Sequence, residues 1–371
     1  MITYGSQYIF KNDFAILKKA LSSKKISQGK YCESFEKKLK KFLKVKHTCL
    51  TNSGTSAIQL AFESLNLKKG SIVIMPAITF VATLSIAKKL GFKIYLADIN
   101  FETGQITAKT ILDCILKNKI KPDLIITMYM GGYVFDIDNI YNLKKKYKCF
   151  IIEDACHAFG SEYYNKKTKR KSKIGSCKYA DISTFSFHPL KTITTGEGGF
   201  LSTNNHRIAK NAKLLSSHGI IRNKKDHTKY KINNFGYNFR MSDINAALGI
   251  SQLKNIYKIL DYRKKIYKNY TEKLKNVSFI RNKDPNISSY HLFIVRVNNK
   301  RNILDIMKKN KIFCQYHYIP LYKFSAFGKN DKKLYNSEKY YKKSISLPIH
   351  LGITSKEQSK VIKLINKFAK N

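Results

Sequence analysis

The stretch SFHPLKTITTGEGG, residues 186–199, holds one lysine, Lys191, with no other Lys, Arg, Asp or Glu before Glu197. A lysine that is shielded from solvent loses proton affinity, becomes nucleophilic and can form a Schiff base with an aldehyde. Ser186, at the start of the stretch, could donate a hydrogen bond to a phosphate. A surface lysine between two glycine-rich turns fits the same residues, so this stretch alone leaves both interpretations open.

Two adjacent carboxylates end an apolar run in CFIIEDACHAFG, residues 149–160, where Glu153 and Asp154 are followed by His157. A carboxylate at the end of a buried strand is unfavourable unless a cationic group pairs with it. The protonated ring nitrogen of a cofactor could be that partner. A satisfied polar pair, or an ion pair with a structural Lys or Arg, would explain the residues equally well.

Two further segments place polar residues at the starts of predicted helices. In TNSGTSAIQLAF (51–62), residues 53–56 open a helix whose free N–H groups and short hydroxyls suit a phosphate. In GYNFRMSDINAALG (236–249), Asn238 and Arg240 precede a helix whose N-cap is Ser242 or Asp243. An ordinary capped helix explains either segment when it is considered alone.

These segments lie in a region, residues 46–205, that alternates short apolar runs with helical patterns. Strands separated by crossover helices form a largely parallel sheet covered on both faces, and ligands bind at the carboxyl ends of its strands. The last two runs follow each other too closely for a helix, so we expect them to be antiparallel or at an edge. The predicted strands are HTCLTN (47–52), SIVIMP (71–76), KIYLADI (93–99), DLIITMYM (123–130), CFIIEDA (149–155), DISTFSF (181–187) and GFLSTN (199–204).

The pattern changes after residue 250. A long amphipathic segment from Leu253 to Leu274 has apolar residues mostly at three- and four-residue steps, and strand and helix patterns follow it. We therefore predict a large domain of residues 12–250. We assign residues 251–371, together with residues 1–11, to a smaller C-terminal α+β domain.

Composition excludes several classes of protein. The formal net charge of +46 invites a nucleic-acid interpretation, but the lysines are spread along the chain. We therefore expect a solvated basic surface that helps to attract an anionic substrate, and no nucleic-acid partner. Seven cysteines without a Cys-x-x-Cys pair, and an N-terminus without an apolar signal core, favour a reduced cytoplasmic compartment. The uncharged stretch 70–87 is divided by Pro76 into a strand and a helix, so we expect no membrane span.

Signatures of other enzyme classes are absent from the sequence. There is no G-x-G-x-x-G after a strand, no G-x-x-x-x-G-K-[ST] and no G-x-S-x-G. No His or Cys cluster has metal-ligand spacing, so we expect no metal.

Taken together and in this order, EDACHAFG, SFHPLKTITTGEGG and GYNFRMSDINAALG resemble the DegT/StrS family of nucleotide-sugar aminotransferases, which use pyridoxal 5'-phosphate (PLP). The resemblance extends over nearly the whole chain. It implies PLP fold type I, the aspartate aminotransferase-like α/β fold, with a mostly parallel seven-stranded sheet in the large domain. It also implies a homodimer with shared active sites.

The resemblance assigns a role to each matching position. Lys191 takes the place of the lysine that forms the Schiff base with PLP, where relatives that catalyse dehydration have His. Asp154 matches the aspartate paired with the pyridinium nitrogen, and His157 lies beside the cofactor ring. The remaining cofactor contacts are Thr55, Ser56 and Ser186 for the phosphate, Phe80 for the ring face, and Asn238 for the phosphate of the neighbouring subunit.

Within the family, the motifs look most like those of the C4 aminotransferases of pseudaminic acid synthesis. This implies transfer of an amino group from L-glutamate to a UDP-linked 2-acetamido-2,6-dideoxy-4-keto hexose. A GDP- or dTDP-linked perosamine-type sugar is the alternative substrate. A non-catalytic PLP-binding regulator is the alternative class, although every named catalytic position is present. The residues implied for the sugar-nucleotide pocket are Tyr4, Ile26, Ser27, Gln28, Gly29, Tyr316, His317, Tyr318 and Ile319.

Overall fold

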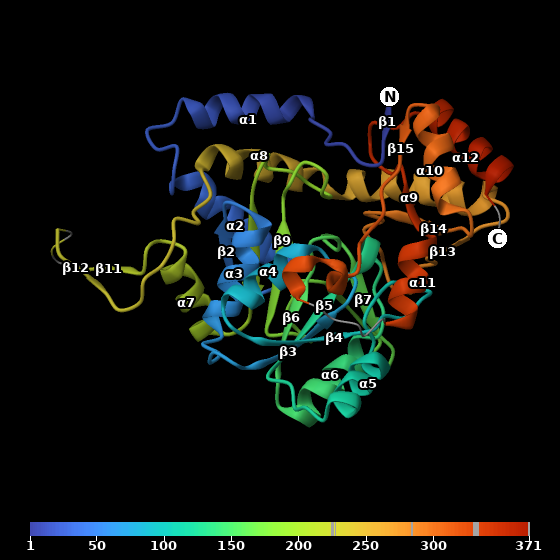
Figure 1. Cartoon of the computed structure of the whole chain (residues 1–371). Helices are drawn as coiled ribbons and strands as arrows, with labels where there is room; N and C mark the ends of the chain where they lie inside the picture. Colours follow the sequence, from blue (N-terminus) through green and yellow to red (C-terminus); the bar gives the residue numbers. More distant parts are fainter. Residues whose placement is uncertain (224–225, 227, 283–284, 329–333, 370–371) are drawn as a thin grey trace.

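The computed structural model describes residues 1–223, 226, 228–282, 285–328 and 334–369. Its centre is a seven-stranded sheet with the strand order β2-β10-β9-β6-β5-β3-β4 (Figure 1). Only β10 is antiparallel to its neighbours in this sheet. The mostly parallel seven-stranded sheet is therefore confirmed. Its strands are β2 (His47–Thr51), β3 (Ile72–Pro76), β4 (Lys93–Ala97), β5 (Leu124–Met128), β6 (Phe150–Asp154), β9 (Ile182–Ser186) and β10 (Gly199–Thr203).

The expectation for the last two strands is confirmed in its first alternative. β10 is antiparallel, as one alternative required, but it lies between β2 and β9 and not at an edge. β9 is an interior strand that pairs parallel with β6. The short connection between β9 and β10 requires only that the two strands be neighbours. The position of the pair in the sheet depends on β2, which comes far earlier in the chain.

Side-chain alternation explains why both faces of the sheet are covered. In β3, Val73 and Met75 pack in one apolar cluster and Ile74 packs in another on the opposite face. One face is covered by α3 (Gly54–Ser64), α4 (Val81–Lys89) and α7 (His206–Leu215). The other face is covered by α2 (Lys30–Leu43), α5 (Ala108–Asn118), α6 (Ile137–Tyr147) and α8 (Asp243–Lys254).

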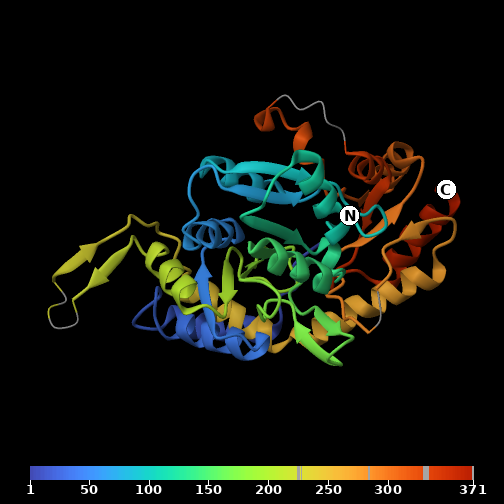
Figure 2. The ribbon, with the colours of Figure 1, turned by 90° about the horizontal axis from the view of Figure 1, so that it is seen from below.

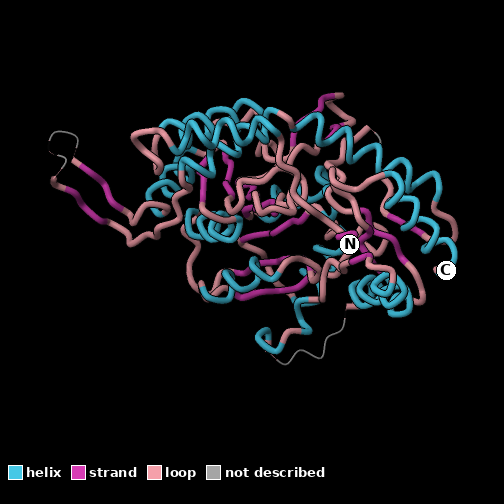
Figure 3. The backbone as a smooth tube through the Cα atoms, turned by 90° about the horizontal axis from the view of Figure 1, so that it is seen from above, coloured by secondary structure: helices cyan, strands magenta, loops and turns pink. Residues whose placement is uncertain are grey.

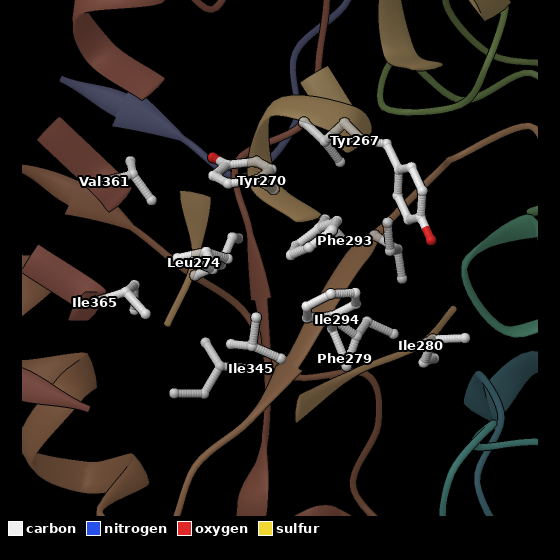
Figure 4. Packing of buried hydrophobic residues seen from close by; sticks show 14 of the residues in the cluster. Tyr267, Tyr270, Leu274, Phe279, Ile280, Phe293, Ile294, Ile345, Val361 and Ile365 are labelled. Atoms are coloured by element: carbon white, nitrogen blue, oxygen red, sulfur yellow. The ribbon is translucent and has the colours of Figure 1, made fainter. Parts of the chain in front are cut away.

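The C-terminal part of the chain builds a second, antiparallel sheet of order β13-β14-β16. Figure 4 shows Tyr267 and Tyr270 beside Phe293, and the rings of Tyr270 and Phe293 lie 4.7 Å apart between centroids. Strand β1 (Ile2–Thr3) pairs parallel with β15 (Ile312–Phe313), so the first residues join this part (Figure 1). Its other elements are α9 (Ile256–Lys273), β13 (Ser278–Phe279), β14 (Phe293–Arg296), α10 (Lys300–Lys309), α11 (Tyr335–Lys343), β16 (Ser344–Leu347) and α12 (Ser355–Phe368).

The remaining elements lie at the periphery. Helix α1 (Lys11–Leu21) lies along α8. The β11 (Ile220–Arg222) and β12 (Tyr230–Ile232) hairpin projects away from the rest of the chain (Figures 2 and 3). The β7 (Glu162–Asn165) and β8 (Arg170–Lys173) hairpin carries the basic run 166–173.

The predicted boundary at residue 250 falls inside α8, and the division into two domains stays a prediction. No helix in the described part of the chain is long and apolar enough to cross a bilayer.

Candidate active site

A cavity of 320 Å³, the first cavity, opens at the carboxyl edge of the central sheet. Its walls come from the segments that follow β2, β3, β6 and β9, which are far apart in sequence. Parallel strands bring these segments to one edge. The cavity brings together six of the predicted cofactor residues, namely Thr55, Phe80, Asp154, His157, Ser186 and Lys191.

The two carboxylates at the end of β6 face opposite ways because side chains alternate along a strand. Glu153 accepts hydrogen bonds from the Tyr129 and Ser183 hydroxyls at 2.5 Å each, and burial raises its pKa. Asp154 is 4% exposed and lines the first cavity. Its Oδ1 accepts from the Cys156 N–H at 3.1 Å, the Cys156 thiol also hydrogen-bonds to this carboxylate, and no cationic side chain of the described residues forms an ion pair with it. Glu153 is therefore the satisfied polar group, and Asp154 is the carboxylate free to pair with a ligand cation.

Lys191 lies in the loop between β9 and β10, which is held by main-chain hydrogen bonds. The Lys191 N–H donates to His188 O at 2.8 Å, and the Thr195 N–H donates to Phe187 O at 3.0 Å. Burial lowers the pKa of Lys191, and the nearby Cys156 and Asp154 oppose this shift. Its amine forms no ion pair with any described residue. A larger fraction of this amine is therefore neutral and nucleophilic than for an exposed lysine.

The N-terminus of α3 forms another wall. Ser53 caps the helix by accepting from the Ser56 N–H at 3.0 Å, so the ordinary capping interpretation holds. Ser53, Gly54 and Thr55 also line the first cavity beside Ser186, where free N–H groups and hydroxyls can bind an anion. Ser56 does not line it, and its hydroxyl donates to Asn52 Oδ1 at 2.7 Å.

Aromatic side chains surround the cavity. Phe80 precedes α4 and is 52% exposed although it lines the cavity, so one face of its ring is free to stack on a planar ligand. His157 Nε2 lies 3.0 Å from the Tyr318 hydroxyl. Burial, reinforced by Lys191, His291 and His317, holds the pKa of His157 well below its ordinary value. His157 is therefore a neutral imidazole.

A second cavity, of 370 Å³, adjoins the first one. Both are lined by Phe80, His157, His188, Lys191 and Tyr318, so Lys191 borders both cavities. Five residues expected in the sugar-nucleotide pocket line the second cavity, namely Tyr4, Tyr316, His317, Tyr318 and Ile319.

Five other predicted residues line neither cavity within this chain. The segment 26–29 packs against the start of α8, where the Gln28 side chain donates to Met241 O at 3.1 Å and the Gly29 N–H donates to Asp243 Oδ1 at 3.0 Å. Asn238 is exposed, and its carbonyl accepts from the Asn52 side chain at 3.2 Å. The binding roles of Ile26, Ser27, Gln28, Gly29 and Asn238 stay predictions.

The sequence interpretation missed residues that line the cavities. Cys156 and His188 lie inside the quoted motifs, and their position within those motifs could have identified them. His291 lies two residues before the first residue of the apolar strand β14 and lines the second cavity. The signal in the sequence that could have identified His291 was a polar residue next to an apolar run.

The first cavity offers the groups that PLP requires. Lys191 can bind its aldehyde, Asp154 can hold its protonated ring nitrogen, and Phe80 can cover its ring. The start of α3, with Ser186, can bind its phosphate. The residues present therefore fit the cofactor.

Comparison with known proteins agrees with this chemistry. The model of the DegT/DnrJ/EryC1/StrS aminotransferase family matches residues 7–366. A relative in Campylobacter jejuni, a UDP-4-amino-4,6-dideoxy-N-acetyl-beta-L-altrosamine transaminase, is 38% identical over 96% of this chain and 94% of its own length.

Two solved structures are similar over almost the whole chain. Helicobacter pylori PseC, an aminotransferase involved in the biosynthesis of pseudoaminic acid, has a TM-score of 0.91 and 29% identity, covering 99% of this chain and 98% of that one. The PLP form of Spr1654 from Streptococcus pneumoniae has a TM-score of 0.89 and 26% identity, covering 98% and 97%.

Proposed function

The chain belongs to the DegT/DnrJ/EryC1/StrS aminotransferase family, and from this membership we propose a specific reaction for it. It is a PLP-dependent nucleotide-sugar aminotransferase. The proposed reaction transfers an amino group from L-glutamate to C4 of a UDP-linked 2-acetamido-2,6-dideoxy-4-keto hexose, in pseudaminic acid biosynthesis. The observation that carries the proposal is the convergence of Lys191, Asp154 and the α3 N-terminus on one cavity.

When bound, PLP supplies an aldehyde for amino groups and a ring that accepts electron density. Asp154 holds the ring nitrogen in its protonated form, because a buried carboxylate stabilises an adjacent cation. The free N–H groups at the start of α3, with the Ser186 hydroxyl, bind the phosphate. Phe80 covers the ring face, and neutral His157 packs beside it.

Lys191 moves the protons of the reaction. Its lowered pKa leaves the amine able to take a proton from the α carbon of glutamate and to return one to C4 of the sugar. Both carbons must come within reach of this amine, and Lys191 lines both cavities. The face from which Lys191 delivers the second proton determines the configuration at C4.

Sugar binding is assigned to the second cavity. Its predicted residues are aromatic, imidazole or aliphatic groups, which suit the neutral face and hydroxyls of a hexose. The named product of the C. jejuni relative, a UDP-linked 4-amino-4,6-dideoxy sugar, supports the choice of nucleotide and of carbon atom.

We extend the proposal to assembly and location. Asn238 is exposed in this chain, which suits a residue that reaches the phosphate of a neighbouring subunit in a homodimer. All seven cysteines are free, which suits the reducing cytoplasm.

An absorbance experiment tests the reaction. The purified, PLP-loaded protein is mixed with L-glutamate and then with UDP-, GDP- or dTDP-linked 4-keto sugars in turn. We expect the yellow band of bound PLP to bleach with glutamate and to return only with the UDP-linked 2-acetamido sugar. Return with only a GDP- or dTDP-linked sugar would replace the substrate by the perosamine-type alternative. A band unaffected by any amino donor would reject the aminotransferase reaction.

A further inference from the structure

His291 is a buried group that the chemistry above does not use. It is 6% exposed and lines the second cavity. Its ring lies 4.4 Å from that of His157, between centroids, so it borders the side of the site where the substrate must meet Lys191.

The main chain at His291 is held firmly in place. Its N–H donates to Gly131 O at 2.9 Å. Arg263 Nη1 donates to the carbonyls of Tyr290, His291 and Ile349 at 3.3, 3.2 and 3.0 Å. Arg263 is 2% exposed and forms no ion pair with any described residue. Its buried guanidinium therefore donates its hydrogen bonds to these carbonyls. The main chain that carries the His291 ring is thus held by Arg263 of α9 and by Gly131.

The nitrogens of the His291 ring have no partners within the described part of the chain. Nδ1 is enclosed and makes no hydrogen bond. Nε2 makes no hydrogen bond to a described residue either, but this nitrogen is not enclosed, so a ligand can reach it. A buried hydrogen-bonding group without a partner is unfavourable, and a ligand that bonds to it removes that penalty.

The surroundings select the kind of ligand. Burial, with Lys191 nearby, holds the pKa of His157, His291 and His317 below the ordinary value of imidazole. Lys191 is the one Lys, Arg, Asp or Glu among the residues that line the second cavity in the described chain. In a neutral imidazole one nitrogen donates a hydrogen bond and the other accepts one. Such a ring carries no charge, so it suits a hydroxyl or an amide better than a carboxylate.

We propose that His291 is a specificity-determining residue that hydrogen-bonds a neutral substituent of the keto sugar in the second cavity. The inference rests on the proposed function, because it concerns the sugar half of that reaction. Loss of the bond weakens sugar binding and leaves the reaction with glutamate intact.

The test measures the two half-reactions separately by the absorbance of bound PLP, first with L-glutamate and then with the UDP-linked 4-keto sugar. His291→Phe keeps a ring of similar size and removes both nitrogens, whereas His291→Gln keeps a donor and acceptor near the position of Nε2. The exposed His206, changed to Phe, is the matched control.

We expect His291→Phe to raise KM for the sugar about 10- to 100-fold, the effect of one lost hydrogen bond. His291→Gln should recover most of that loss, and His206→Phe should match the wild type. All variants should react with glutamate within about threefold of the wild-type rate.

Two outcomes would overturn the inference. A normal sugar KM in His291→Phe would mean that the nitrogens do not contact the sugar. An equal loss in both half-reactions, with bound PLP and the melting temperature retained, would assign His291 to general site assembly. Failure of the wild type with every keto sugar would instead reject the proposed function.

Discussion

Gly54 lies where the start of α3 approaches the end of β9, and its replacement should separate the two walls of the phosphate site. A Cβ atom on Gly54 would lie 2.7 Å from Ser186 Cβ, 3.0 Å from its Oγ and 3.2 Å from its Cα. The first distance is shorter than real carbon contacts, and the last atom is main chain. Gly54→Ala therefore cannot be accommodated by a rotation of the Ser186 side chain alone.

The expected change in the free energy of unfolding of Gly54→Ala is the difference between two opposing effects. Overpacking destabilises a protein by about 1–3 kcal/mol. Alanine in place of glycine in a helix returns up to about 1 kcal/mol. We expect the free energy of unfolding, measured in urea, to fall by about 0–2 kcal/mol.

The larger effect should be on the cofactor, because displacement of Ser186 weakens a hydrogen bond to a charged phosphate. Such bonds contribute about 1.5–3 kcal/mol, so PLP affinity should fall about 10- to 100-fold. Titration of the apoprotein with PLP, followed by absorbance, measures this change.

Gly5→Ala is the matched control, because a Cβ there would lie 3.6 Å from Leu190 Cδ2, an ordinary contact close to the Lys191 loop. We expect wild-type affinity for PLP from it. If Gly54→Ala also bound PLP with wild-type affinity, the close approach of α3 to Ser186 would not be required for phosphate binding, and the reasoning would be refuted.

Three further predictions concern the titratable groups. Lys191→Ala should lower turnover by about 100- to 10,000-fold or more, and a rate close to wild type in a stopped assay would contradict its proton-transfer role. Asp154→Asn should lower kcat about 100-fold or more with the melting temperature nearly unchanged, and full activity would remove its role at the ring nitrogen. Burial raises the pKa of Glu153 in the folded state above its ordinary value of 4.5, so the stability linked to it is present below that value and is lost as pH rises through the folded pKa. Glu153→Gln should therefore gain stability relative to wild type as pH rises, and a constant difference in urea midpoints between pH 4 and pH 8 would disprove the shift.

Much of the fold was predictable from local pattern. The strands of the central sheet are buried on both faces, so they appear as continuous apolar runs, and each predicted run is a strand. The polar residues that end these runs, such as Asp154 and Ser186, are at the carboxyl edge because parallel strands share one direction. Its residue type and isolated position left the role of Lys191 open, and the resemblance to the DegT/StrS family assigned the Schiff-base role to it.

Other features depended on contacts between distant segments. Local pattern did not place β10 between β2 and β9, because strand order depends on the packing of the whole sheet. It did not distinguish Thr55, which lines the first cavity, from Ser56, which does not line it and whose hydroxyl bonds to Asn52. One residue along a helix rotates a side chain by about 100°, so neighbours in sequence face different surroundings.

The sequence by itself determined which residues could react and the alternating strands and helices that carry them, because residue chemistry and apolar periodicity are local properties. Only the tertiary structure decided that Glu153 is satisfied by Tyr129 and Ser183 while Asp154 faces the cavity. Only the tertiary structure brought His291 beside His157, across 133 intervening positions of the chain. That contact exists because Arg263 and Gly131 hold the segment before β14 against the edge of the central sheet.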